Sequence, residues 1–89
     1  LPELERTLAQ RKADRPAGSY VVTLLDDPSL VVAKVMEEAE EVTRAAREES
    51  DERVDEEAAD VLFHLMALLQ GRGHSLGGAQ DVLRDRRKS

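Results

Sequence analysis

Two pairs of acidic residues carry the strongest chemical signal in this sequence. Glu38 and Glu41 stand three positions apart, and so do Glu57 and Asp60. Residues at this spacing lie on one face of a helix, one turn apart, so each helix presents two carboxylates in one direction. Two such faces turned toward each other form an oxygen-only site for a hard cation, Mg²⁺ or, as a second possibility, Mn²⁺.

The apolar residues around the first pair indicate that one of its carboxylates faces inward. Val31, Val35, Glu38, Val42 and Ala45 follow the alternating four- and three-residue spacing of a core seam. Glu38 therefore occupies a position where an apolar residue is expected.

The second pair shows the same anomaly, because Glu57 borders the heptad stripe formed by Val54, Val61 and Leu68. An ordinary solvated face is the alternative for any acidic run. An unpaired carboxylate inside the protein would cost several kcal/mol, however, so we expect a cation beside these side chains.

Other polar residues allow more than one interpretation. His64 follows Asp60 by one turn and is either a hydrogen-bonded core residue, a substrate contact or a partner of a metal ligand. Lys12 belongs to a basic group shortly before Ser19 and Tyr20, which either clamps phosphate or compensates the dipole of its own helix.

Helices must position these residues, because aromatic content is 2% and Ala, Leu, Glu and Arg dominate the composition. The pattern predicts helices over residues 2–13, 20–25, 28–49, 52–70 and 76–83. Ser19 and Ser75 are the expected caps of the second and the last helix, and either Asp27 with Pro28 or Ser29 starts the third. Residues 84–89 are expected to be a solvated, frayed tail.

The chain is expected to form a single all-α domain over residues 1–89, a helical bundle of four to five helices completed by homodimerisation. A core built from 89 residues is marginal on its own. The helix over residues 52–70 is also apolar on nearly all sides, so its burial requires a second subunit.

Charge and composition exclude several function classes. A net charge of −6 argues against a basic face for nucleic acid and against attraction to anionic membranes. The longest apolar stretch, residues 61–69, is too short to span a bilayer. The sequence has no cysteine, which rules out disulfides and thiolate metal sites and is compatible with the cytoplasmic location that we expect.

Several segments together resemble a known family. The pattern Glu-Glu-x-x-Glu followed by Glu-x-x-Asp is similar to the metal motif of the all-α nucleoside triphosphate pyrophosphohydrolases, the MazG-like superfamily. Within it, the chain resembles the phosphoribosyl-ATP pyrophosphohydrolases of histidine biosynthesis. The segments that carry this narrower resemblance are residues 16–20 (PAGSY), 34–39 (KVMEEA), 56–65 (EEAADVLFHL) and 72–76 (RGHSL).

The resemblance implies a dimeric helical enzyme that hydrolyses the α–β phosphoanhydride of phosphoribosyl-ATP to phosphoribosyl-AMP and pyrophosphate. It implies that the Mg²⁺ ligands are Glu38, Glu41, Glu57 and Asp60. Glu37 would orient water or complete the metal shell as the catalytic residue. The substrate-binding residues that the resemblance implies are Lys34, Ser19 and Tyr20, and the residue chemistry described above adds Lys12 and His64 as predicted substrate contacts.

Two alternatives remain open from the sequence. One is a house-cleaning MazG-like enzyme that hydrolyses other nucleoside triphosphates. The other is a non-enzymatic helical dimerisation module whose acidic face binds a partner or a metal ion. If the carboxylates converge, Mg²⁺ should raise the melting temperature and Glu38→Gln should stabilise the metal-free protein.

Overall fold

The computed structural model describes residues 1–87, and these residues form an all-α arrangement. The helices are α1 (Pro2–Asp14), α2 (Tyr20–Asp26), α3 (Pro28–Glu48), α4 (Asp51–Gly71) and α5 (Leu76–Arg87). The predicted all-α class and all five helices are confirmed, with boundaries that differ by at most four residues. Within the expected tail, residues 84–87 continue α5, and residues 88–89 lie outside the described chain.

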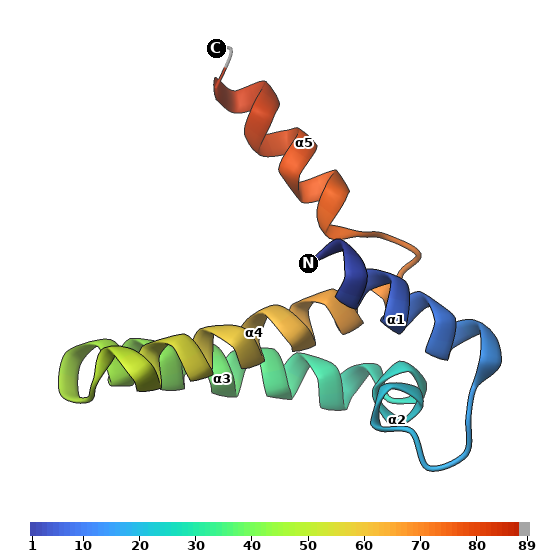
Figure 1. Cartoon of the computed structure of the whole chain (residues 1–89), viewed down its shortest axis with the longest axis horizontal. Coiled ribbons are helices and arrows are strands. Elements are labelled where there is room, and N and C mark those ends of the chain that lie inside the picture. Colours follow the sequence, from blue (N-terminus) through green and yellow to red (C-terminus); the bar gives the residue numbers. More distant parts are fainter. Residues whose placement is uncertain (88–89) are drawn as a thin grey trace.

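Two long helices dominate the arrangement. Figure 1 shows α3 and α4 lying side by side as an antiparallel hairpin, with α1 and α2 gathered at the end of the hairpin where α3 begins and α4 finishes. None of the helices in the described chain combines the length and apolar composition needed to cross a bilayer.

Local caps explain where the two long helices begin. Asp27 accepts a hydrogen bond from the backbone N–H of Leu30 at 3.1 Å, and Pro28 occupies the first helical position of α3. Asp27, rather than Ser29, therefore starts this helix. Ser50 caps α4 in the same way through the N–H of Arg53 at 3.3 Å.

The predicted cap of α2 is only half right. Ser19 stands at the N-cap position, but its side chain makes no capping bond within residues 1–87. Its hydroxyl instead accepts a hydrogen bond from Arg11 at 3.4 Å. The turn before it relies on Gly18, whose φ of 76° lies in the left-handed region that suits glycine.

Two small clusters form the core. The first unites Leu8 of α1, Val21 of α2 and Met66 of α4. The second unites Leu24, Val31 and Ala67 from α2, α3 and α4. Both clusters tie the short helices to the hairpin, so they fix the position of α2 over the α3–α4 pair.

The last helix leaves the body of the molecule (Figure 1). Leu76 packs against the first core cluster, but Val82 and Leu83 are 48% and 57% exposed. The start of α5 is held by Glu5 of α1, whose carboxylate accepts the backbone N–H of Leu76 at 2.9 Å. Ser75 stands immediately before α5, at the position predicted for its cap, and the Glu5 contact satisfies the N–H of the first helical residue.

Removing the Glu5 carboxylate should loosen α5. Because this group satisfies an N-terminal backbone N–H of the helix, Glu5→Ala should cost about 1 kcal/mol locally. Amides in α5 should then exchange hydrogen about fivefold faster, as measured by exchange mass spectrometry. Glu3→Ala, an exposed position on the same helix, serves as the control. Unchanged exchange in the Glu5 variant would contradict a capping role.

Candidate active site

The acidic residues lie on the facing stretches of α3 and α4. Glu38 and Glu57 are 8% and 5% exposed, which confirms that both face inward as the seam spacing predicted. Glu41 is half-buried, whereas Glu37 and Asp60 are exposed. The hairpin therefore buries one carboxylate from each helix and leaves the others toward the rim.

Glu38 is paired with a histidine from the opposite helix. Its Oε2 lies 2.8 Å from Nδ1 of His64, and the other ring nitrogen, Nε2, lies 2.8 Å from the hydroxyl of Tyr20. His64 is 6% exposed. The structure thus confirms the interpretation of His64 as a hydrogen-bonded core residue, and it connects Tyr20 to the same network.

Glu57 faces a second carboxyl group, that of Glu41. The hydrogen bond that a protonated Glu41 makes with Glu57 raises the pKa of Glu41, and burial and the charges of Glu57, Glu37 and Glu38 raise it further. When both groups are ionised neither can donate, and the buried Oε2 of Glu57 has no partner within residues 1–87. A positive charge at this point would satisfy both carboxylates.

Arg53 partly supplies that charge. Its guanidinium donates to Oε1 of Glu57 at 2.6 Å and also bonds Glu56, which raises the pKa of Arg53. Together with Glu41, Arg44 and Glu49, Arg53 and Glu57 line a polar cavity of about 220 Å³. The sequence reasoning missed Arg53 and Arg44, although Arg53 stands one turn before Glu57 and Arg44 stands one turn after Glu41.

These residues suit a hard cation in their chemistry. The donors are carboxylate oxygens, one buried oxygen lacks a partner, and two like charges oppose each other across the hairpin. Within residues 1–87, however, no three acidic or histidine side chains already stand close enough together to hold a metal ion. The four-carboxylate cage therefore stays a prediction about the metal-bound state, and of its members the described chain brings Glu41 and Glu57 against each other.

The other predicted site residues are held by neighbouring groups. Lys34 lies 3.9 Å from Glu37, and both side chains are partly open to solvent. The ammonium group of Lys12 donates to the carbonyl of Gln70 at 2.7 Å. Ser19 accepts from Arg11. Lys34 and Glu37 thus lie on α3, the helix that carries Glu38. The Lys12 contact instead joins α1 to the end of α4.

The Glu41–Glu57 contact predicts a pH-dependent stability in Mg²⁺-free buffer. Because the folded-state pKa of Glu41 lies above its ordinary 4.5, the native state binds more protons than the unfolded state in that range. This contribution to stability is present below pH 4.5 and is lost as the pH rises through the raised pKa. Glu41→Gln should therefore raise the melting temperature at pH 7 and change it little at pH 4.

Glu40→Gln is the matched control on the next residue. Its bond to Arg44 lowers the pKa of Glu40, so removal of this charge should give no stabilisation at pH 7. Both variants can be followed by calorimetry with EDTA present. Equal melting temperatures for Glu41→Gln and the parent at pH 7 would contradict the repulsion between Glu41 and Glu57.

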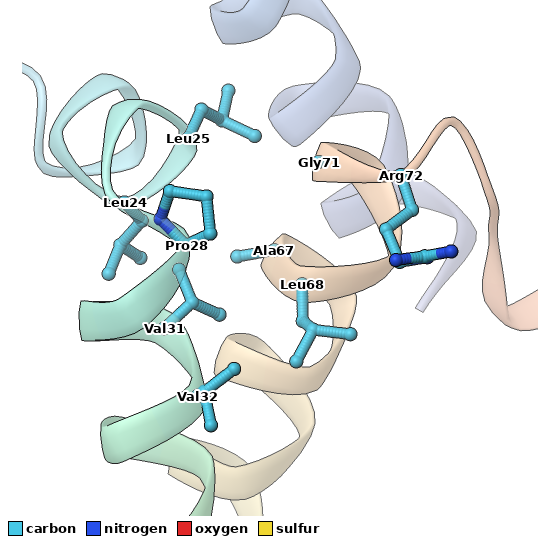
Figure 2. A pocket seen from close by; sticks show the side chains of 9 residues that line it. All are labelled: Leu24, Leu25, Pro28, Val31, Val32, Ala67, Leu68, Gly71 and Arg72. Carbon is cyan, nitrogen blue, oxygen red and sulfur yellow. The ribbon is translucent and has the colours of Figure 1, made fainter.

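A second cavity, of about 400 Å³, opens where α2 meets the hairpin (Figure 2). Its lining consists of Leu24, Leu25, Pro28, Val31, Val32, Ala67, Leu68, Gly71 and Arg72. This lining is apolar apart from Arg72 and contains no carboxylate. Glu41 and Glu57, one member of each acidic pair, line the polar cavity and not this one.

Comparison with known proteins agrees with this geometry. The profile of a family described as phosphoribosyl-ATP pyrophosphohydrolase matches residues 1–87. The chain is 45% identical to the phosphoribosyl-ATP pyrophosphatase of Metallosphaera sedula, over 99% of this chain and 96% of that protein. It is 37% identical to the enzyme of the same name from Caulobacter vibrioides, over 97% of this chain and 80% of the relative.

A longer relative matches as well. The chain is 41% identical to the histidine biosynthesis bifunctional protein HisIE of Bacillus subtilis, over 94% of this chain. The match spans only 41% of that relative's length. The similarity is therefore confined to one part of the bifunctional protein.

Proposed function

The chain belongs to the phosphoribosyl-ATP pyrophosphohydrolase family, a family of hydrolases, and we propose that it acts on phosphoribosyl-ATP in histidine biosynthesis. In the proposed reaction, water cleaves the α–β phosphoanhydride and releases phosphoribosyl-AMP and pyrophosphate. The observation that carries the proposal is the buried Glu57 oxygen opposite Glu41, which has no hydrogen-bond partner among the described residues, in a chain that matches this family over residues 1–87. A cytoplasmic location is part of the same proposal.

We propose that Glu38, Glu41, Glu57 and Asp60 hold Mg²⁺, with Mn²⁺ as a substitute. When bound, the ion would neutralise the charge of the polyphosphate and so reduce its repulsion of an incoming nucleophile. The protein supplies carboxylate donors held on two packed helices, which keeps their positions constant between turnovers.

The remaining residues have roles that follow from their positions. Glu37 is a carboxylate open to solvent beside the buried Glu38, so it can accept a proton from an attacking water. Lys34, one turn earlier, can donate to a phosphate oxygen. Arg44 and Arg53 line the polar cavity and add two further phosphate donors to those predicted from the sequence.

A homodimer is also part of the proposal. The radius of gyration is 14.4 Å, against about 12 Å for a compact domain of this length. On α3, Val32 and Met36 are 48% and 70% exposed, and on α4 Leu62 is 37% exposed. A second copy would cover these apolar residues and complete the bundle.

Turnover measurements test the function directly. Pyrophosphate release should be measured with phosphoribosyl-ATP and Mg²⁺, beside a panel of standard and modified deoxynucleoside triphosphates. We expect turnover of phosphoribosyl-ATP that is lost with EDTA. Cleavage of the deoxynucleotides alone would instead support a house-cleaning enzyme. Failure to cleave any nucleotide would support a dimerisation module.

A further inference from the structure

Glu38, His64 and Tyr20 form a chain of hydrogen bonds whose direction can be deduced. The Nδ1 atom of His64 lies 2.8 Å from Oε2 of Glu38 and 3.0 Å from the backbone carbonyl of Asp60. A carbonyl oxygen only accepts, and an ionised carboxylate only accepts as well. Nδ1 must therefore carry the hydrogen.

The other end of the imidazole follows from this assignment. In the neutral ring, a hydrogen on Nδ1 leaves Nε2 as an acceptor. The group 2.8 Å from Nε2 is the hydroxyl of Tyr20, which can donate. The bonds therefore run from the Tyr20 hydroxyl to His64, and from His64 to Glu38.

Aromatic packing holds the imidazole in this orientation. The ring of Phe63 meets it edge-on, with centroids 5.1 Å apart and planes at 90°. Tyr20 meets it at 85° and stacks nearly parallel to Phe63. Since both ring nitrogens are occupied and two rings flank the imidazole, His64 is not available to the substrate in this state.

We propose that Tyr20 and His64 are positioning residues that orient the Glu38 carboxylate for the cation. The N–H of His64 fixes one carboxylate oxygen and leaves Oε1 for the metal, while Tyr20 selects the tautomer that makes this bond. When a residue that hydrogen-bonds a metal ligand is lost, the affinity for the metal commonly falls 10- to 100-fold. This inference rests on the proposed function, and it replaces substrate binding as the role predicted for Tyr20 and His64.

The chain of hydrogen bonds from Tyr20 through His64 to Glu38 is called the relay below. Metal titration of matched variants tests it. His64→Leu removes the donor to Glu38 and should weaken Mg²⁺ binding about 10- to 100-fold in isothermal titration calorimetry. Tyr20→Phe keeps the stacked ring and removes only the hydroxyl, so it should weaken binding about fivefold. Circular dichroism of each metal-free variant should show retained helix.

His64→Asn gives a finer test, because its amide can replace the Nδ1 donor but offers nothing to Tyr20. This variant should bind Mg²⁺ no more than about fivefold more weakly than the parent. Adding Tyr20→Phe to it should have no further effect, because the hydroxyl no longer has a partner. Additive losses in the double variant would overturn the relay.

A readout without metal or substrate completes the experiment. Nitrogen NMR of the metal-free protein should show His64 protonated at Nδ1 and unprotonated at Nε2, with the Nε2 resonance shifted in Tyr20→Phe. The opposite tautomer would overturn the relay, as would unchanged Mg²⁺ affinity in folded His64→Leu.

The relay and the proposed function can fail separately. A relay-dependent Mg²⁺ affinity without hydrolysis of phosphoribosyl-ATP would overturn the function alone. Hydrolysis by the parent together with unchanged Mg²⁺ affinity in both single variants would overturn the relay alone.

Discussion

Glu57→Gln should lower kcat/KM for phosphoribosyl-ATP by about 1000-fold, the scale associated with losing one preorganised electrostatic group. The substitution preserves the shape of the side chain and its acceptor toward Arg53, but it removes the charge of the buried carboxylate. Because the second oxygen of Glu57 lies opposite Glu41 and has no hydrogen-bond partner in the described part of the chain, the metal-free protein should not lose stability. Pyrophosphate release at saturating Mg²⁺ and thermal melting with EDTA measure the two effects.

Glu56→Gln is the control for this experiment. Glu56 precedes Glu57 on α4 and also bonds Arg53, but its side chain is 59% exposed. Its substitution should change kcat/KM less than about twofold, since an exposed ion pair contributes little. If Glu57→Gln retains a tenth or more of the parent activity, Glu57 does not hold the catalytic cation.

Leu24→Ala should destabilise the protein by about 3 kcal/mol, within the range measured for leucine truncations in protein cores. Leu24 is 1% exposed and packs in one cluster with Val31 and Ala67, where α2 meets the hairpin. For a domain of this size the loss corresponds to a melting temperature lower by about 15 °C. Chemical denaturation at one fixed protein concentration gives the free energy of unfolding, because the proposed dimer makes stability concentration-dependent.

Leu1→Ala is the matched control, since Leu1 is 55% exposed. The same truncation there should change the free energy of unfolding by less than about 0.5 kcal/mol. A loss below about 1 kcal/mol in Leu24→Ala would contradict the packing of α2 on the hairpin. Tyr20 is carried by α2, so this packing also determines whether its hydroxyl reaches His64.

The sequence and the structure indicate different residues for the strongest repulsion between carboxylates. The spacing places Glu38 in the core seam and predicts that Glu38→Gln stabilises the metal-free protein if the carboxylates converge. The structure gives Glu38 a donor, His64, and places two opposed carboxyl groups at Glu41 and Glu57 instead. Among the glutamate-to-glutamine substitutions, Glu41→Gln is therefore expected to stabilise the metal-free protein most.

Local signals predicted the helices well and failed where the partner was distant in the sequence. Asp27 and Ser50 each cap a backbone N–H three residues further along the chain, and Pro28 occupies the first position of α3. The contact between Glu5 of α1 and the first backbone N–H of α5, by contrast, joins residues 71 positions apart and was not predicted. Short-range spacing contains no information about such a contact.

The sequence by itself determined the helical class, the approximate helix limits and the inward orientation of Glu38 and Glu57. It could do so because hydrophobic periodicity defines which face of a helix is buried, and both glutamates fall in or beside that face. Only the tertiary structure decided which groups meet: Glu38 with His64, His64 with Tyr20, and Glu41 with Glu57. These pairs depend on the relative rotation and axial offset of α2, α3 and α4, which the packing of the core sets and the periodicity of a single helix does not contain.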